Sequence, residues 1–426
     1  MKFGGALLIG APNIERVASL IQEFSCEPLV VVVSAIGKTT NALENLFQLS
    51  QDGGKMDNEF FKIKQAHIGY AQEIMPEIPD ELSKNLDNLF DELWDVLNNK
   101  YDTRYQAYDS IVSVGEDLSS CIIYHYLKFS GLNVRLISAK SLIVTDSNYT
   151  DAAVNWKYTT STIKSRVLPA INNNEIVITQ GFTGSDKYGF STTLGREGSD
   201  FTAAILGNIL EANEVTIWKN VPGLMNADPA LFPDAIKLDS LSYHEAIELA
   251  YYGASVIHPK TIQPLKQKNI PLFVRSYFDS SIQPTIITNN SKNDGSQPSI
   301  IVKKNQVLLS ISTLNLSFIA EKNLVNIFAA FSKNKIHINL MQNSAVSFSV
   351  CFNEDMIKLA ELLSDLKTSY SLKYNTGLKL ITIRHYNDEL INKLTGNNKV
   401  YLFQKSRVNV QFLIKDNDST TNLVDY

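Results

Sequence analysis

Short apolar segments alternate with longer amphipathic segments throughout residues 1–276, and this alternation constrains the fold more than any other feature of the sequence. The apolar segments are Leu29–Val33, Ser110–Val114, Glu175–Thr179, Glu214–Trp218 and Ile270–Val274. Short continuous apolar runs are typical of strands buried on both faces, and the amphipathic segments between them are typical of covering helices. The pattern predicts parallel βα units, and therefore an α/β core.

A second pattern interrupts this alternation between residues 55 and 108. Apolar and aromatic residues recur there at helical spacing, namely Phe60, Phe61, Ile63, Ile68, Tyr70, Ile74, Leu86, Leu89, Phe90, Leu93, Trp94 and Leu97. This spacing predicts a helical excursion inserted in the α/β core. The simplest interpretation of its aromatic residues is that they form the packing face of the excursion itself.

The chain changes character after the α/β region. Residues 277–298 are rich in turn-forming residues, which predicts a linker. Residues 299–426 then contain the order strand, helix, strand, strand twice, which predicts two related α+β modules, the first over about 305–366 and the second over about 367–426. The second module lacks one strand unless residues 299–304 supply it.

Composition limits the classes of function. The 426 residues are 44% hydrophobic and 19% charged, with a net charge of −5 and no long basic run, so nucleic acid is not an expected partner. The apolar runs are too short to span a membrane, and the N-terminus does not resemble a signal peptide. Three widely spaced cysteines predict neither a disulfide framework nor a zinc site, so we expect a cytoplasmic protein without a metal cage of its own.

The segment VVVSAIGKTTN, residues 31–41, resembles half of a phosphate-binding P-loop at first sight. A P-loop requires a second glycine five residues before the glycine of its Gly-Lys pair, because its backbone N–H groups wrap the phosphates. Val32 occupies that position. The segment is therefore not a P-loop, and phosphate must be bound elsewhere.

The segment TTLGREGSDFTAAI, residues 192–205, is the strongest candidate for an anion site. Gly195 and Gly198 permit a close backbone approach, and Ser199 or Asp200 can cap a helix that begins near Phe201. A helix start beside an arginine binds anions readily. The alternative is a plain turn between a strand and a helix with solvent-facing charges.

Other motifs decide between these alternatives. They are QGFTG (180–184), VSVGEDLSS (112–120), IWKNVPGLMNADP (217–229), LAYYGASVIHPKT (249–261) and the N-terminal Lys2-Phe3-Gly4-Gly5. Together with TTLGREGSDFTAAI, this ordered set resembles the signature of the amino acid kinase family, and of its aspartate kinases in particular. The C-terminal modules resemble the ACT regulatory domains that follow the catalytic domain in that family.

The resemblance implies a fold and an activity. The fold is a three-layer αβα sandwich with a mainly parallel central sheet, followed by two ferredoxin-like (βαββαβ) ACT domains. The activity is transfer of the γ-phosphoryl group of ATP, bound with Mg²⁺, to the β-carboxylate of L-aspartate. Such a transfer needs cations and hydrogen-bond donors around the phosphoryl oxygens and little covalent chemistry from the protein.

The resemblance also implies roles for individual residues. Lys2 would reach the transferring phosphoryl group, Gly4 and Gly5 would donate backbone N–H groups to it, and Asp200 would orient Lys2 or the pocket. Arg196 would bind the α-carboxylate of aspartate and Glu116 its α-ammonium group, although a carboxylate that favours a helix N-terminus is another interpretation of Glu116. The remaining residues of the substrate pocket would be Ser34, Thr40 and Phe182, with Phe182 closing it. The implied nucleotide-binding residues are Lys219, Asn220, Met225, Asp228, Ser255 and Lys260, with Mg²⁺ held mainly by the phosphates.

Several positions depart from the family pattern. Leu7 stands where a serine hydroxyl is usual, Asn220 where aspartate is frequent, and Ser255 where a basic residue is frequent. These departures suggest a lower affinity for ATP or a different nucleotide pose, for which Lys260 could compensate. They leave open a second hypothesis, that the chain is a catalytically weakened regulatory subunit that senses an amino acid.

ACT domains of this family pair side by side and bind an end-product amino acid, so the resemblance implies a homodimer and feedback by lysine or threonine. The corresponding effector residues are Asn339, Met341, Ser344 and Ala345. Many relatives carry aspartate at the first of these positions and glutamate at the last, so the effector remains an open question in the sequence.

Overall fold

Two units make up the structure, which is a computed structural model that describes residues 1–254, 257–315, 317–396, 398–416 and 423–425. Unit 1 contains residues 1–224, 237–247 and 255–293. Unit 2 contains residues 225–236, 248–254 and 294–426. Two short segments of the α/β region thus belong to unit 2, and residues 277–293 of the predicted linker belong to unit 1.

Unit 1 is built on a mainly parallel sheet. Among the described residues the strand order is β3-β4-β2-β1-β7-β9-β10-β8, and β9 and β10 are the only antiparallel neighbours. The strands are β1 (Lys2–Phe3), β2 (Val30–Val33), β3 (Val134–Leu136), β4 (Ile176–Gln180), β7 (Val215–Lys219), β8 (Ser240–Ser242), β9 (Leu272–Ser276) and β10 (Thr285–Thr288). Four of the five predicted strands are confirmed, as β2, β4, β7 and β9.

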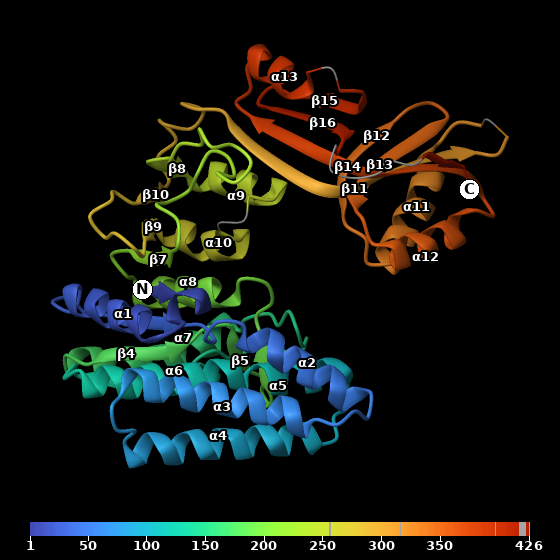
Figure 1. Ribbon diagram of the computed structural model, residues 1–426. Helices are drawn as coiled ribbons and strands as arrows, with labels where there is room; N and C mark the ends of the chain where they lie inside the picture. Colours follow the sequence, from blue (N-terminus) through green and yellow to red (C-terminus); the bar gives the residue numbers. More distant parts are fainter. Residues whose placement is uncertain (255–256, 316, 397, 417–422, 426) are drawn as a thin grey trace. The chain divides into compact units, whose positions relative to one another are not determined.

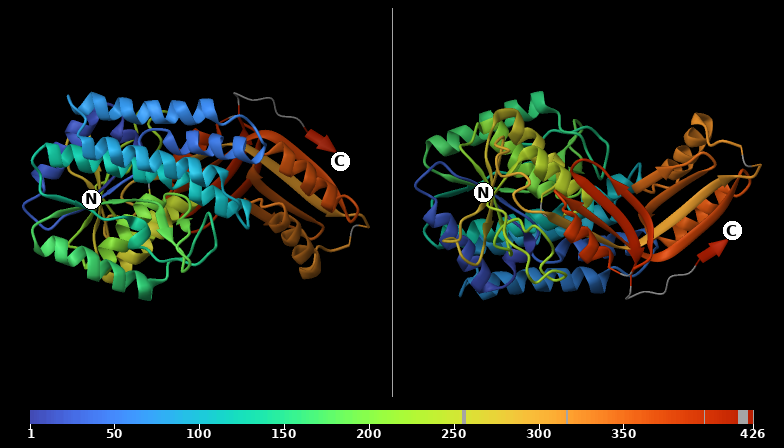
Figure 2. Two further views of the ribbon diagram at one scale, coloured as in Figure 1. Left: turned by 90° about the horizontal axis from the view of Figure 1, so that it is seen from below. Right: turned by 90° about the horizontal axis from the view of Figure 1, so that it is seen from above.

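Helices cover both faces of this sheet (Figures 1 and 2). One of them, α6, packs on β2, β3 and β4, whereas α7 packs on β4 and α8 on β1, β2 and β7. A two-stranded ribbon and two short 3₁₀ segments lie in the connections. The helices are α1 (Ala11–Glu23), α2 (Thr39–Gln51), α6 (Val114–Phe129), α7 (Trp156–Asn172), α8 (Gly198–Leu210), α9 (Tyr243–Tyr252) and α10 (Pro259–Lys268); the smaller elements are η1 (Gly5–Leu8), η2 (Ala139–Ser141), β5 (Thr183–Ser185) and β6 (Ser191–Thr193).

The helical excursion predicted for residues 55–108 is confirmed. It consists of α3 (Asp57–Ile74), α4 (Asp80–Asn98) and the start of α5 (Arg104–Val112). One apolar stripe of α4 is buried, and it consists of Leu82, Leu86, Phe90, Leu93 and Leu97. Phe60 of α3 packs edge-on against Phe90 and Trp94 of α4. The aromatic residues thus form the packing face of the excursion.

The predicted strand Ser110–Val114 is wrong, because this segment is the end of α5 and the start of α6. Thr103 accepts a hydrogen bond from the backbone N–H of Gln106 and so begins the helix that runs into the apolar segment. Ile111, Val112 and Val114 are buried. A short apolar run that is buried on all sides has the same composition in a helix as in a strand, and periodicity does not separate the two.

The predicted linker 277–298 also differs from the structure, because it contains β10. Thr285 is buried at the start of this strand; its hydroxyl donates to the carbonyl of Leu238 at 2.5 Å and accepts from the backbone N–H of Leu224 at 2.9 Å. Ile287 is buried as well. Two alternate inward residues are enough to hold a strand of this length, although turn-forming residues flank it.

Unit 2 is built on one antiparallel sheet with the order β12-β13-β11-β14-β16-β15 in the described residues, and β17 pairs with β14. The strands are β11 (Ser299–Thr313), β12 (Ile338–Asn343), β13 (Ser347–Asn353), β14 (Tyr370–Arg384), β15 (Val400–Lys405), β16 (Asn409–Lys415) and β17 (Leu423–Asp425), and the helices are α11 (Glu321–Lys333), α12 (Met356–Leu366) and α13 (Asp388–Thr395). Two ferredoxin-like modules follow each other along this sheet.

Both modules share the two long strands β11 and β14. The C-terminal part of β11, Gln306–Thr313, pairs with Tyr370–Leu378 in the first module, and its N-terminal part, Ser299–Lys303, pairs with Leu380–Arg384 in the second. The prediction that residues 299–304 supply the missing strand is therefore confirmed. The register shifts between the two parts, where Asn305 has a φ of 53°.

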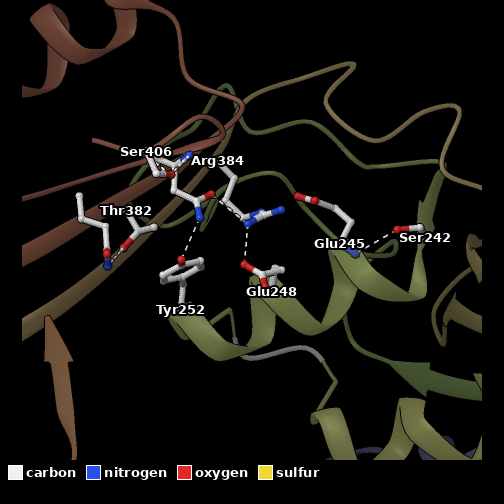
Figure 3. Close-up of polar contacts among 9 residues, drawn as sticks. Ser242, Glu245, Glu248, Tyr252, Thr382, Arg384 and Ser406 are labelled. Atoms are coloured by element: carbon white, nitrogen blue, oxygen red, sulfur yellow. Dashed lines mark hydrogen bonds and ion pairs between the residues drawn. The ribbon is translucent and has the colours of Figure 1, made fainter. Parts of the chain in front are cut away.

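A buried arginine joins the second module to the end of α9 within unit 2 (Figure 3). Arg384 Nη1 lies 2.7 Å from Glu248 Oε2 and 2.9 Å from Asn409 Oδ1. Asn409 Nδ2 donates to the hydroxyl of Tyr252 at 2.8 Å. We call these four residues the Arg384 cluster.

None of the helices in the described part of the chain combines the length and the apolar composition that crossing a membrane requires.

Candidate active site

A pocket of about 520 Å³ opens in unit 1 where β2, β4 and β7 end at their carboxyl edges. This is the edge at which open α/β sheets bind their ligands. Several residues predicted for the site line the pocket, and they come from six parts of the chain: Lys2 and Gly5, Ser34 and Thr40, Glu116, Phe182, Arg196 and Asp200, and Lys219.

Two lysines meet one carboxylate in this pocket. Lys2 Nζ lies 2.5 Å from Asp200 Oδ1, and Lys219 Nζ lies 3.2 Å from Asp200 Oδ2. Asp200 is 1% exposed. Burial alone would raise the pKa of Asp200, but the two lysines outweigh it and bring the pKa below its ordinary value. We call these three residues the Asp200 cluster; with both lysines charged it carries one excess positive charge.

Glycines permit a close approach of two loops at the pocket. A Cβ on Gly5 would lie 2.0 Å from the carbonyl oxygen of Ala35, and the N–H of Gly37 donates to the carbonyl of Gly5 at 2.9 Å. A Cβ on Gly4 would lie 3.5 Å from Lys2 Nζ. The end of β1 and the loop after β2 therefore fit together only because position 5 has no side chain.

The loop before α8 carries Arg196 and departs from the predicted helix start. The helix begins at Gly198 rather than near Phe201, and Glu197 precedes it with a left-handed φ of 54°. Asp200 lies in the first turn and pairs with the lysines instead of capping the helix. A Cβ on Gly198 would lie 2.8 Å from Cδ2 of Phe182. The ring of Phe182 and the start of α8 are thus in direct contact, and the helix start faces the pocket.

Glu116 is a buried carboxyl group in the first turn of α6. Burial raises the pKa of Glu116 to about 8, although a backbone hydrogen bond from Ala35 and the charge of Lys2 act in the opposite direction. Within the described residues, no group is at hydrogen-bonding distance from its Oε2 atom. A partly unsatisfied acid in a pocket suits a ligand that brings a positive charge.

Among the described residues, Asn220, Met225, Asp228 and Lys260 are not part of the lining of this pocket. Asn220 is exposed, and the ammonium group of Lys260 pairs with the carboxylate of Asp151. Met225 and Asp228 belong to unit 2, where Asp228 Oδ1 accepts from the N–H of Ala230 in a turn. Ser255 lies outside the described residues. Leu7, one of the departures from the family pattern, is buried in the core of unit 1.

The predicted effector residues lie on and beside β12. Asn339 Oδ1 accepts from Lys303 Nζ at 2.8 Å, and Met341 is half exposed. The hydroxyl of Ser344 turns back toward the neighbouring strand β13, and the carbonyl of Ala345 accepts from the N–H of Ile319 at 2.9 Å. The side chain at position 339 is thus an amide that accepts a hydrogen bond from a lysine of this chain.

Several pocket residues were not predicted from the sequence. They are Glu44, Tyr108, Thr150, Thr193 and Glu197. The hydroxyl of Tyr108 donates to Glu44 Oε1 at 2.6 Å. The sequence did contain a signal for Asp109, which follows Tyr108 directly. Asp109 precedes the buried segment Ser110–Val114, and an acidic residue at the border of a core helix requires hydrogen-bond partners.

Comparison with known proteins identifies the family. Residues 1–276 match the amino acid kinase family. The aspartokinase of Chlamydia trachomatis is 32% identical over 314 residues, which cover 72% of this chain and 69% of that protein. The chain belongs to the aspartokinases of the amino acid kinase family.

Other aspartokinases match as well. Aspartokinase 1, chloroplastic, of Arabidopsis thaliana is 30% identical over 374 residues, which are 85% of this chain and 64% of that relative. Aspartokinase III of Escherichia coli has been solved in complex with aspartate and ADP and in complex with lysine and aspartate. These structures are 25% identical to this chain, cover 98% of it and have TM-scores of 0.82 and 0.81, each matched over 96% of its own length. The predicted fold class is confirmed.

Proposed function

We propose that the chain is an aspartate kinase, which transfers the γ-phosphoryl group of ATP to the β-carboxylate of L-aspartate and forms 4-phospho-L-aspartate and ADP. This reaction is the first step of lysine, threonine and methionine biosynthesis. The kinship with aspartokinases supports the reaction, and so does the aspartate and ADP complex of the E. coli relative. The observation that carries the proposal is the Asp200 cluster, which lies in the same pocket as Arg196 and Glu116.

The Asp200 cluster supplies positive charge for the phosphoryl transfer. A carboxylate oxygen of aspartate attacks the γ-phosphorus in line while the bond to the ADP oxygen breaks, so negative charge from both reactants meets at one centre. Lys2 and Lys219 stabilise that charge, and Asp200 holds both ammonium groups in place before the substrates arrive. Backbone N–H groups at Gly4 and Gly5 and at the start of α8 complete the donors.

Arg196 and Glu116 distinguish an amino acid from a simple dicarboxylate. The guanidinium group of Arg196 binds the α-carboxylate through two parallel hydrogen bonds, and the carboxylate of Glu116 binds the α-ammonium group. Ser34 and Thr40 contact the same substrate, and Phe182 covers it against the start of α8. The β-carboxylate is then the group left free to react.

We assign ATP to the side of the pocket bounded by Lys219. The family resemblance adds Asn220, Lys260, Met225, Asp228 and Ser255 as candidate nucleotide-binding residues. The protein offers cations to the phosphates, because both oxygens of Asp200 already have ammonium partners. A Mg²⁺ ion that enters with ATP would be held mainly by phosphate oxygens and would neutralise part of their charge.

The C-terminal modules regulate this activity. We assign to them a side-by-side homodimer and an amino-acid effector, either lysine or threonine, which contacts Asn339, Met341, Ser344 and Ala345. The lysine complex of the E. coli relative favours lysine. The three cysteines of the chain are unpaired, which suits a cytoplasmic setting.

Trapping of the product tests the reaction. Purified protein is incubated with Mg-ATP and L-aspartate, and the acyl phosphate is captured with hydroxylamine, beside L-glutamate and no-substrate controls. We expect aspartyl hydroxamate with aspartate alone. Absence of product from a folded protein that still binds aspartate contradicts the proposal and favours a regulatory subunit that senses amino acids, and reversion of Leu7 to serine then becomes the next variant.

A further inference from the structure

Asp109 is a fully buried carboxylate of α5 with three hydrogen bonds. Its Oδ2 accepts from the backbone N–H of Thr150 at 2.9 Å and from the backbone N–H of Thr193 at 2.8 Å, and its Oδ1 accepts from the hydroxyl of Thr193 at 2.8 Å. Burial raises the pKa of Asp109, and the hydrogen bonds from both threonines lower it in part. One side chain thus joins two segments that are distant in the sequence.

Both of these segments form the wall of the pocket, whereas Asp109 itself lies behind it. Thr150 and Thr193 line the pocket. Thr150 has a φ of 73°, a left-handed conformation that costs a β-branched residue about 1–3 kcal/mol and persists only where the surroundings impose it. The hydrogen bond from its N–H to Asp109 is one such constraint. A second constraint acts on the same segment, since the N–H of Ala152 donates to the carbonyl of Thr193 at 2.9 Å.

The same two segments determine the course of the loop that carries Arg196. Thr193 ends β6, and Gly195 follows it with a φ of 79°. A Cβ on Gly195 would lie 2.5 Å from Oδ1 of Asp151, so the loop before α8 runs directly against the segment that Asp109 holds. A shift of either segment therefore displaces the backbone from which Arg196 projects.

We propose that Asp109 is a positioning residue for aspartate binding: its carboxylate fastens the Thr150 and Thr193 segments together and thereby aims Arg196 at the substrate. The inference rests on the proposed function and extends it to a side chain that does not touch the pocket. Its contribution is geometric. The three hydrogen bonds that Asp109 accepts hold the two segments in place, and a negative charge near the substrate is not required. Asparagine preserves this geometry, because its carbonyl oxygen accepts from both N–H groups and its amide donates to the hydroxyl of Thr193.

Steady-state kinetics of Asp109→Ala and Asp109→Asn test the proposal. We expect Asp109→Ala to raise the KM for aspartate at least tenfold while the KM for ATP stays within twofold, and Asp109→Asn to stay within threefold of the wild type in both. The matched control is Thr285→Val. The buried hydroxyl of Thr285 also joins two segments, because it accepts from the backbone N–H of Leu224 and donates to the carbonyl of Leu238, but none of these three residues lines the pocket. The KM for aspartate of Thr285→Val should stay within twofold of the wild type.

Three results would overturn the proposal: an unchanged KM for aspartate in Asp109→Ala, an equal rise of both KM values, or an Asp109→Asn variant as impaired as Asp109→Ala. If Asp109→Ala does not fold, Thr193→Val removes one of the three hydrogen bonds, and it must show a smaller rise confined to aspartate. Deuterium exchange provides a readout without activity. Peptides covering residues 145–155 and 190–197 should exchange faster in Asp109→Ala than in the wild type, and unchanged exchange contradicts the proposal even if the wild type forms no aspartyl phosphate.

Discussion

Unit 1 and unit 2 each bury a basic side chain against a carboxylate, but the two arrangements differ in charge and in purpose. In the Asp200 cluster two lysines share one carboxylate, and the pocket opens beside them. In the Arg384 cluster the arginine pairs with Glu248, and the amide of Asn409 and the hydroxyl of Tyr252 extend the hydrogen bonds. The first arrangement carries excess charge toward a cavity, and the second matches an arginine with the carboxylate of Glu248.

This difference shows how the residues of a binding site can be distinguished from those of a structural ion pair. An excess of buried positive charge is unfavourable until an anion arrives, so it is retained for function. A neutral, hydrogen-bonded pair needs no ligand, and removing one partner harms the fold instead. Activity and stability should therefore respond to substitutions in opposite ways in the two clusters.

The largest expected effect is on catalysis in Lys2→Met. This substitution keeps the length of the side chain and removes its charge, while Asp200 retains Lys219 as a partner. We expect kcat to fall about 1,000-fold, or about 4 kcal/mol, with the KM for aspartate within about threefold and a nearly unchanged melting temperature. Lys128→Met is the control, since Lys128 and its partner Glu81 are both more than half exposed. A large loss of stability in Lys2→Met with a normal kcat would show that the Asp200 cluster stabilises the fold and does not serve catalysis.

Arg384→Met should show the opposite behaviour. The side chain of Arg384 is 4% exposed and that of Glu248 is 32% exposed, so the stranded carboxylate regains only part of its hydration. We expect the free energy of unfolding, measured in urea, to fall by about 2–3 kcal/mol, which is less than for a fully buried pair. Adding Glu248→Gln should restore at least half of the loss. Additive losses in the double variant would show that the two residues do not act as a pair.

Arg196→Ala should weaken substrate binding and leave the fold intact, because the side chain of Arg196 is exposed. Loss of a charged, bidentate contact is worth about 2 kcal/mol, so the KM for aspartate should rise about 30-fold. Arg196→Lys should recover only part of this loss. Kinetics of both variants are measured with each substrate varied at a saturating concentration of the other. Equal effects on the KM values for aspartate and ATP would show that Arg196 is not specific to the aspartate side of the pocket.

The smallest expected effect is a dependence on pH through Glu116. With a pKa of about 8, Glu116 is mostly protonated at pH 7, and it binds an ammonium group better once it ionises. The KM for aspartate should therefore fall by up to about fivefold as the pH rises from 7 to 8, because the ionised fraction of Glu116 rises by that factor, and this slope should be absent in Glu116→Gln.

The same group affects stability with a defined sign. Its pKa is raised in the folded state, so the folded protein keeps a proton that the unfolded chain releases above about pH 4.5. The wild type should lose stability relative to Glu116→Gln between about pH 5 and 8, as followed by thermal unfolding. A constant difference between the two proteins over this range would mean that Glu116 is ionised in the fold.

The sequence predicted the fold where burial follows a local rule. The runs around Val31, Ile178 and Ile217 became central strands because each is continuous, apolar and flanked by helical segments. The same rule was wrong for Ser110–Val114, where burial on all sides favours a helix equally, and it could not find β1, which has two residues. Strand β10 was hidden by the turn-forming residues around it.

The site was predicted less from local rules than from a resemblance. Spacing alone gave an anion site near Arg196, and the family motifs added Lys2, Glu116 and Lys219, which line the same pocket. The link between Asp109 and Thr193 joins residues that are 84 positions apart, and no local pattern encodes such a contact. The raised pKa of Glu116 likewise depends on burial by the whole fold.

The two long strands of unit 2 have a consequence for how the modules fold. Each of these strands runs through both modules, so neither module has a complete set of strands that belongs to it alone. Melting one module would unpair half of β11 and half of β14 and would leave the rest as open sheet edges. The two modules should therefore unfold in a single cooperative transition, as one domain that merely repeats its own architecture.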